Sequence, residues 1–174
     1  FDTKPYGGNK KDYIQKTNAL AGVGSTKVKP VWNGGGTVLL TVLDSEYNKA
    51  SDTLVQFVQN EIDPTKDGTG VGIAPIGHVV TVQTADEVVV TISTNITFQE
   101  GYSFSSQKTA IEEAINAYLL EIRKVWADET ASVVRISQIE TRILNLTGVV
   151  DINNTKINGA ASNLVLGEYE IPVL

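Results

Sequence analysis

A unit of secondary structure occurs twice in this sequence, and it limits the possible folds more than any other feature. Residues 19–23 and 145–149 read Ala-Leu-Ala-Gly-Val and Asn-Leu-Thr-Gly-Val, and each closes a stretch with helical spacing. About ten residues later come Asn33-Gly34 and Asn158-Gly159, a dipeptide favoured in tight β-hairpins. Helix, glycine stop, strand, hairpin turn and second strand, used twice, predict two similar α/β modules.

Four stretches have the apolar spacing of amphipathic helices. The longest is 105–126, where the apolar positions recur every three or four residues and charged residues take the other side. A helix from residue 9 or 10 to 20 stops at Gly22. A helix over 51–62 has Ser51 as its N-cap. A helix over 137–146 starts with Ser137 and Glu140, which have the spacing of a capping box, and it ends at Gly148.

Strands are indicated by alternation of apolar and polar residues. The clearest is residues 88–98, which alternate with period two as one strand, one face buried and the other mostly exposed. Further strands are predicted at 26–32, 37–43, 78–84, 149–157 and 164–173, the last with a bulge at Gly167.

Helices and strands alternate in an order that defines the fold class. The order is α-β-β-α-β over residues 1–84 and β-α-α-β-β over residues 85–174, so we predict a domain boundary near Ala85. Both orders predict an α+β fold, in which helices pack on one face of a small, mainly antiparallel sheet.

Composition excludes several classes of function. A formal net charge of -6 opposes binding to nucleic acid, and no apolar run approaches the roughly 20 residues that would insert into a membrane. The absence of cysteine excludes disulfides, zinc-thiolate sites and thiol catalysis. Because the sequence contains no methionine, we expect it to be a piece of a longer polypeptide.

Motifs for chemistry are few, and each has a simpler explanation. His78 is the only histidine, and we interpret it as an ordinary residue at the start of a strand. Residues 63–68 resemble the start of a calcium loop, but Ala74 stands where the bidentate glutamate belongs. The glycines at 34–36 precede a strand, whereas a phosphate-binding loop precedes a helix. The sequence therefore predicts no catalytic residue, no cofactor and no metal site, and it favours a structural protein over an enzyme.

Two alternatives remain open at this point. A surface adhesin or carbohydrate-binding module would gather exposed aromatic side chains around one groove, and the residues to inspect are Tyr6, Tyr47, Tyr102 and Tyr169. A small metal-independent hydrolase would place His78 in a pocket beside a serine and a carboxylate.

A series of turns and caps, in a fixed order, resembles the baseplate J-like family of contractile phage tails and related tail-like particles. The resemblance covers nearly the whole chain, and it is carried by Gly7-Gly8-Asn9 with Asp12-Tyr13, and by residues 21–24, 31–38, 62–63, 74–77 with 79–82, 88–126, 136–139 and 147–151.

The resemblance implies a wedge subunit of the baseplate, with no catalytic residues, that works through protein–protein assembly. It implies other wedge, hub or sheath proteins and further copies of itself as partners, and a location in the tail baseplate, assembled in the bacterial cytoplasm. Family members are larger, so the sequence corresponds to their middle and C-terminal parts. Residues 84–87 are a candidate hinge between two rigid modules.

Overall fold

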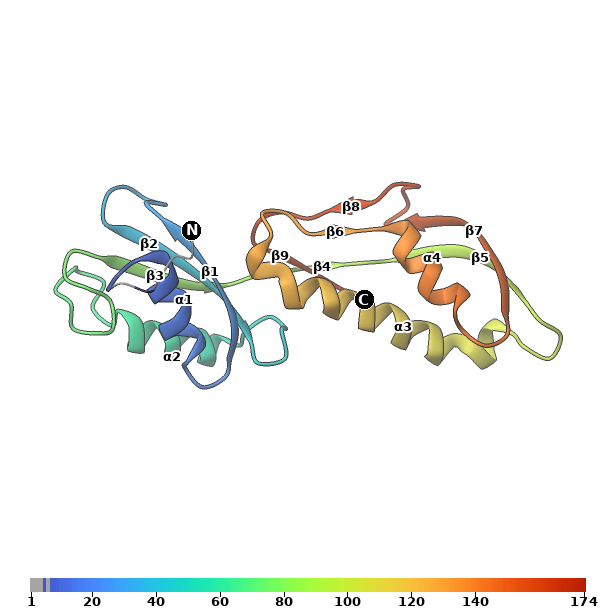
Figure 1. Ribbon diagram of the computed structural model, residues 1–174, viewed down its shortest axis with the longest axis horizontal. Helices are drawn as coiled ribbons and strands as arrows, with labels where there is room; N and C mark the ends of the chain where they lie inside the picture. The colour runs from blue at the N-terminus through green and yellow to red at the C-terminus, as the bar shows by residue number, and fades with distance from the viewer. Residues whose placement is uncertain (1–4, 6) are drawn as a thin grey trace. The chain divides into compact units, whose positions relative to one another are not determined.

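Two separate hydrophobic cores form in the chain. The computed structural model describes residue 5 and residues 7–174. One core draws its buried residues from between Tyr13 and Val82, and the other from between Val90 and Ile157. The chain accordingly divides between Asp86 and Glu87 into two compact units, called unit 1 and unit 2 below (Figure 1).

Unit 1 is a three-stranded sheet with two helices. Its elements are α1 (Lys10–Asn18), β1 (Val23–Pro30), β2 (Thr37–Asp44), α2 (Asp52–Ile62) and β3 (Val79–Thr84). β2 is the central strand, antiparallel to β1 and parallel to β3. The parallel pair follows from the connection, because α2 carries the chain back to the end of the sheet where β2 began. Val38, Leu40 and Val42 of β2 belong to the same core cluster as buried residues of both helices.

The helices of unit 1 begin at polar caps and are tied to the sheet. The Asn9 side chain accepts a hydrogen bond from the Asp12 N–H (2.8 Å), and the Ser51 hydroxyl accepts one from the Leu54 N–H (3.2 Å). Gln59 of α2 bridges to β3, donating to the Val80 carbonyl (3.0 Å) and accepting from the Val82 N–H (2.9 Å). Sequence reasoning identified the Ser51 cap and placed the start of the first helix at residue 9 or 10, but it did not identify Asn9 as a cap. The Gln59 bridge depends on tertiary contact.

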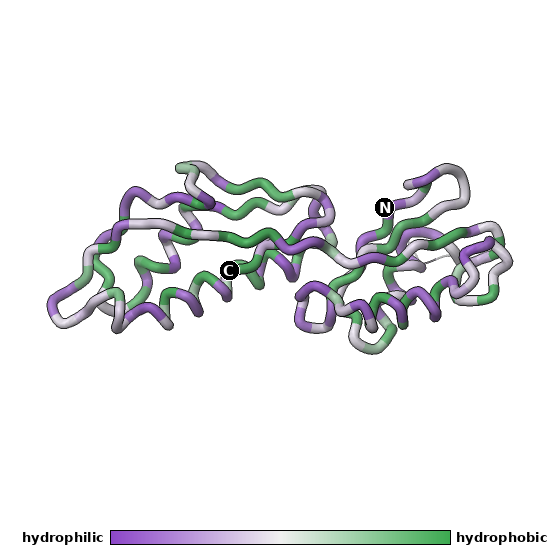
Figure 2. The backbone as a smooth tube through the Cα atoms, turned by 180° about the vertical axis from the view of Figure 1, so that it is seen from behind, coloured by the Kyte–Doolittle hydropathy of each residue, from purple (hydrophilic) through white to green (hydrophobic). Residues whose placement is uncertain are grey.

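Unit 2 is built around one long helix. Its elements are β4 (Asp86–Val89), β5 (Ile92–Phe98), α3 (Phe104–Val125), a 3₁₀ turn (Trp126–Asp128), β6 (Val133–Val134), α4 (Ile136–Leu144), β7 (Val149–Ile157), β8 (Leu164–Val165) and β9 (Glu170–Val173). The strands form three two-stranded pairs, β4 with β9, β5 with β7 and β6 with β8. Hydrophobic and hydrophilic positions alternate along α3 (Figure 2), and its apolar side packs into the core through Ile111, Ile115, Tyr118 and Leu119.

The α+β class is confirmed, and the four helices lie within two residues of their predicted bounds. The strand predicted over 88–98 is wrong as one element. Its predicted alternation holds, with Val90 buried and Thr91 exposed, but it divides into β4 and β5 because the two parts pair with different strands. The strand predicted over 164–173 also divides, into β8 and β9. Instead of a bulge, Gly167 and Glu170 form a turn, in which the Glu170 N–H donates to the Gly167 carbonyl (3.2 Å).

The predicted capping box at Ser137 is wrong. α4 begins at Ile136, so Ser137 lies inside its first turn, and the N-cap residue Arg135 makes no side-chain capping bond. The Asn163 side chain accepts the hydrogen bond from the Ile136 N–H instead (3.0 Å). A capping box does occur at the start of α3, between Ser103 and Ser106.

The repeat that the sequence shows is only partly a structural repeat. Helix, glycine turn and strand occur twice, as α1 to β1 and α4 to β7, and Gly22 and Gly148 both have positive φ. Asn158 and Gly159 form a tight turn with positive φ at both residues, and Ile157 and Ala160 exchange two hydrogen bonds across it. β7 nevertheless pairs with β5 and not with β8, so only the first copy forms a two-stranded hairpin.

Candidate assembly surface

Two loops meet at one end of unit 1 (Figure 1). One joins β1 to β2 over residues 31–36, and the other joins α2 to β3 over residues 63–78. The Val79 N–H donates to the Gly36 carbonyl (2.9 Å), and a Cβ on Gly36 would lie 2.7 Å from the Gly77 carbonyl oxygen. The backbones therefore approach as closely as glycine permits, and we call residues 31–36 and 68–77 the loop pair.

The loop pair holds apolar side chains out of the core. Val31 is 63% exposed, Trp32 43%, Val71 65% and Ile76 82%. Val31 also has φ of 58°, a conformation that a β-branched residue rarely adopts. Exposed apolar side chains on conformationally constrained loops are typical of protein interfaces, and tryptophan is frequent among residues that dominate binding energy.

Hydrogen bonds hold the β1–β2 loop in one shape. The Thr37 hydroxyl donates to the Gly34 carbonyl (2.6 Å) and accepts from the Asn33 N–H (3.0 Å). The Val31 N–H donates to the Thr37 carbonyl (2.7 Å). The loop is therefore closed by its own bonds, which lowers the entropy that binding a partner would cost.

His78 lies directly beside the loop pair and contacts α1. Its Nδ1 is 2.6 Å from the Tyr13 phenolic oxygen, and the two rings stack with centroids 5.8 Å apart. Burial, together with the nearby Asp63 and Asp12 charges, raises the pKa of Tyr13 to about 12. A cavity of about 350 Å³ lies beside Tyr13 and His78, between the start of α1 and the β1–β2 hairpin.

This cavity does not have the groups that the hydrolase alternative requires. Among the described residues that line it, the hydroxyl groups belong to Tyr13 and Thr37, and neither a serine nor a carboxylate is present. Tyr13 occupies Nδ1 of His78, and Thr37 bonds within its own loop. The observed role of His78 is to join the start of β3 to α1.

The loop that resembles a calcium site uses its carboxylates for internal bonds. Asp63 is buried, and its two oxygens accept from the Lys66 and Val80 N–H groups, each at 2.9 Å. Asp67 accepts from Thr65 and Thr69, and these bonds lower its pKa. In the part of the chain that the structure describes, no three His, Cys, Asp or Glu side chains are grouped as metal ligands would be.

The tyrosines proposed for an adhesin are spread over different elements. Tyr47 lies between β2 and α2, Tyr102 precedes α3, and Tyr169 precedes β9. None of these three lines the cavity beside His78, and Tyr6 lies outside the described residues. The structure thus does not gather Tyr47, Tyr102 and Tyr169 around that cavity.

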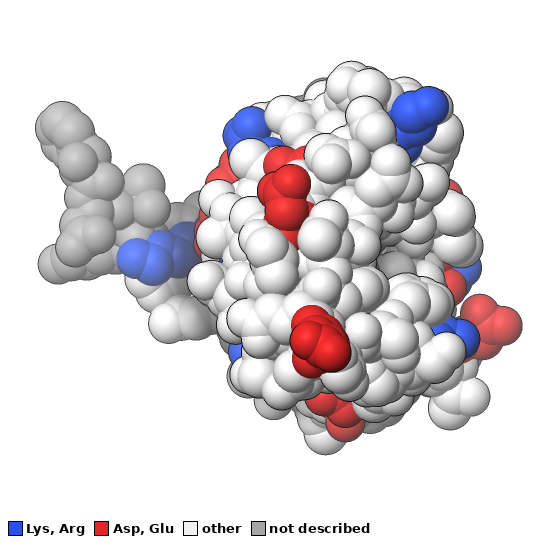
Figure 3. Space-filling view, turned by 90° about the vertical axis from the view of Figure 1, so that its right-hand side faces the viewer, with Lys and Arg blue, Asp and Glu red and all other residues white. Residues whose placement is uncertain are grey.

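Charge is dispersed on the face of unit 2 that Figure 3 shows, where basic and acidic side chains are scattered over a mostly uncharged surface. Over the described residues, no helix combines the length and apolar character that crossing a bilayer needs.

Sequence reasoning missed the exposed residues of the loop pair. A signal for them existed, because Val31-Trp32, Val71 and Ile76 are apolar residues placed among glycine and proline in turn segments. Apolar side chains in such segments have no strand or helix face to bury them.

Comparison with known proteins matches both units to one family. Residues 5–84 match the baseplate J-like central domain, and residues 90–174 match the baseplate J-like protein C-terminal domain. The chain is 40% identical over 166 residues to the phage-like element PBSX protein XkdT of Bacillus subtilis (strain 168), and 42% identical over 166 residues to the protein YqbT of the same strain. Each alignment covers 95% of this chain and 46% of the relative, so the chain spans about half of their length.

The fold also matches a solved structure. A chain of the anti-feeding prophage (AFP) baseplate, determined by cryo-EM, superimposes with a TM-score of 0.64 over 95% of this chain and 37% of that chain, at 9% sequence identity. At this identity the match concerns the fold alone. The two domain matches, which together extend over nearly all of the sequence, show that the chain belongs to the baseplate J-like family.

Proposed function

We propose that this chain is part of a structural subunit, a wedge component, of the baseplate of a contractile phage tail, prophage or tail-like particle. The observation that carries this proposal is that consecutive baseplate J-like domains account for both units. The subunit acts through protein–protein contacts and not through catalysis, and the match of both units to domains of a baseplate protein family supports this.

The loop pair is the surface in unit 1 that we assign to assembly. It presents Trp32 and Ile76 on backbone fixed by close glycine contacts, a combination suited to an interface. The proposed partners are other wedge, hub or sheath proteins and further copies of the subunit. The proposed location is the tail baseplate, with assembly in the bacterial cytoplasm.

We further propose that residues 1–84 and 85–174 act as two modules that turn about residues 84–87 when a baseplate changes state. The separate hydrophobic cores of the two units support this idea, because each can stay packed while the connection bends.

Complementation of a particle-producing strain tests the proposal. The gene for the full-length protein is deleted and replaced by variants with Trp32→Ala or Ile76→Ser, and intact particles are counted by electron microscopy. We expect the deletion to abolish particles with attached sheath and the two variants to reduce them at least about tenfold. Val165→Ser changes an apolar side chain on β8 of unit 2 and is the control, because Val165 is 65% exposed, between the values for Trp32 and Ile76.

Two outcomes would contradict the proposal. Normal particles in the deletion strain would exclude a structural role in the baseplate. Absence of the protein from purified wild-type particles, determined by mass spectrometry, would exclude a place in the finished assembly. A normal unfolding curve for each purified variant is needed to separate lost contacts from lost folding.

A further inference from the structure

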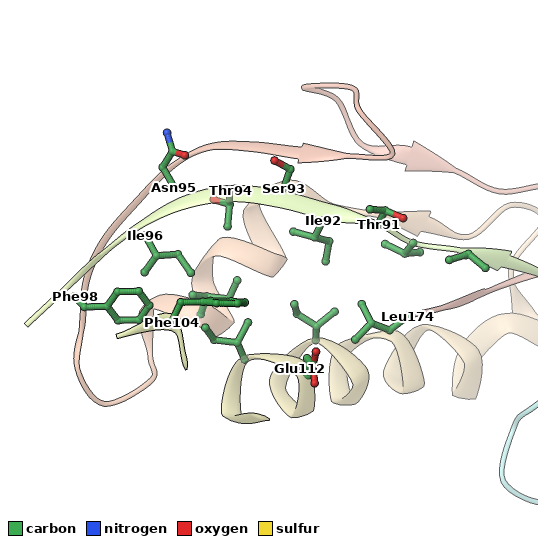
Figure 4. A pocket seen from close by; sticks show the side chains of 15 residues that line it. Thr91, Ile92, Ser93, Thr94, Asn95, Ile96, Phe98, Phe104, Glu112 and Leu174 are labelled. Carbon is green, nitrogen blue, oxygen red and sulfur yellow. The ribbon is translucent and has the colours of Figure 1, made fainter. Parts of the chain in front are cut away.

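An open apolar groove of about 730 Å³ lies between β5 and α3 in unit 2 (Figure 4). Ile92 and Ile96 of β5 point into it from one side, and Ile111 and Ile115 of α3 line the other. Phe98 and Phe104 lie together at one end, and Leu174 lies toward the other (Figure 4). Glu112 is the one charged side chain among the described residues that line the groove.

β5 has an unpaired edge along this groove. In the described part of the chain β7 is its only strand neighbour. The Asn158 N–H donates to the Thr91 carbonyl (2.8 Å), whereas the preceding residue, Val90, donates its N–H to the Val173 carbonyl (2.7 Å). Consecutive residues of an extended strand direct their backbone groups to opposite edges. β7 and β9 therefore lie on opposite edges of the extended segment that contains β4 and β5. The edge that β9 occupies beside β4 is the edge that is unpaired along β5.

The groove continues a slot that β9 already fills. By a slot we mean the space between the edge of the strand and α3. Beside β4 this slot holds Ile171 and Pro172 of β9, and both residues are buried. The Arg123 guanidinium of α3 donates to the Pro172 carbonyl (2.8 Å) and fixes β9 there. β9 leads directly into Leu174, which borders the open part. The same slot thus takes an extended segment beside β4, whereas no segment of the described chain fills it beside β5.

The side chains around the empty part are incompletely buried. Ile92, Ile96 and Phe98 face α3 yet remain half-buried, and Phe104 is 55% exposed. Val38, Leu40 and Val42, which face the helices of unit 1, are at most 6% exposed. Covering the groove would remove apolar surface from water, and a strand would also satisfy the free backbone groups of β5.

We propose that this groove binds an extended segment of a partner protein, which adds as a strand to the free edge of β5. The partner segment is about seven residues long, to match the seven residues of β5, and carries apolar side chains at alternate positions, as strand addition requires. It carries no acidic residue near Glu112, where two like charges would repel. The proposal concerns a second surface and does not depend on the loop pair.

NMR titration of the isotope-labelled 174-residue chain tests the proposal. The probe is the synthetic peptide acetyl-Lys-Thr-Val-Thr-Ile-Thr-Val-Lys-amide. The control peptide has proline in place of the two threonines that flank isoleucine, which keeps the apolar side chains and removes two backbone donors. We expect the probe to shift the amide signals of residues 92–98 and to slow their hydrogen exchange, and the control peptide to bind at least about tenfold more weakly.

A matched pair of variants identifies the groove as the binding site. Phe104→Ser removes a groove side chain that is 55% exposed, and Val150→Ser removes an equally exposed side chain outside the groove. We expect at least about tenfold weaker binding of the probe to Phe104→Ser and unchanged binding to Val150→Ser.

Three results would overturn the proposal. Equal binding of both peptides would show that the groove takes apolar groups without strand pairing. No shift at millimolar probe, or shifts away from β5, would show that the edge is not a binding site. Dimerisation in sedimentation experiments, with protection of β5 in the absence of peptide, would make a second copy of the chain the occupant.

Discussion

The buried carboxylate of Asp63 accepts the backbone N–H of Val80, 17 residues further along the chain, at 2.9 Å. Its second oxygen accepts from the Lys66 N–H. Asp63 is the C-cap residue of α2, and its side chain shapes the following loop and ties it to the start of β3. The residue that resembled the first ligand of a calcium loop is a structural link within unit 1.

Asp63→Asn is therefore expected to destabilise unit 1. The amide keeps one acceptor oxygen, but its NH₂ group would face a backbone N–H that needs an acceptor. Because hydrogen bonds to a charged group are strong and the site is buried, we expect a loss of about 2 to 3 kcal/mol in urea unfolding. Asp67→Asn, on the exposed part of the same loop, is the control and should change stability far less. Equal effects would contradict this role of Asp63.

Tyr13→Phe should have an effect that depends on pH. At pH 8 it removes the hydrogen bond to His78, and we expect a loss of about 1 kcal/mol. The pKa of Tyr13 is raised from 10.0 to about 12 in the folded protein. A raised pKa stabilises the fold below the unfolded value and stops doing so as pH rises through the folded value.

Wild-type protein should consequently lose stability between pH 10 and pH 12, relative to Tyr13→Phe. Urea unfolding of both proteins at pH 8 and pH 11 measures the difference, which should shrink at the higher pH. A difference that stays constant would mean that Tyr13 ionises normally in the folded chain.

Asn163→Ala tests where α4 begins. The Asn163 side chain caps the Ile136 N–H from 27 residues away, so its loss should cost about 0.5 to 1 kcal/mol. Ser137→Ala is the matched comparison, because the capping-box hypothesis predicts that it is the more damaging change. In the structure Ser137 lies inside the helix, and we expect almost no effect on thermal unfolding. The reverse order would restore the sequence-based assignment.

The same contrast shows what the sequence could predict. The four helices could be predicted because the spacing of their apolar residues is a local pattern. The alternation of residues 88–98 could be predicted for the same reason. The point at which that strand divides is set by two residues far along the chain. Val173 bonds to Val90, and Asn158 bonds to the next residue, Thr91. No local pattern contains that information.

The candidate surface was less accessible to sequence reasoning than the fold. Trp32 was predicted to lie in a strand, but β1 ends at Pro30 and leaves Trp32 in the loop. Asn33-Gly34 correctly indicated a turn, yet the turn spans six residues, because Val31 and Thr37 close it. The contact of Gly36 with Gly77 joins two loops about 40 residues apart, which only the tertiary fold can define.

The three consecutive glycines of this loop allow that contact to be tested. Gly35 does not have positive φ, and a Cβ at this position would meet no atom within 4 Å, so Gly35→Ala should be nearly neutral. Gly34 has φ of 97° in open space, and Gly34→Ala should cost about 1 kcal/mol for backbone strain alone. Gly36 has φ of 79°, and its Cβ would in addition meet the Gly77 carbonyl oxygen at 2.7 Å. Backbone cannot rotate away as a side chain can, so Gly36→Ala should be the most destabilising of the three in urea unfolding. If Gly34→Ala and Gly36→Ala proved equal, the two loops would not be in the contact that fixes the exposed Trp32 and Ile76.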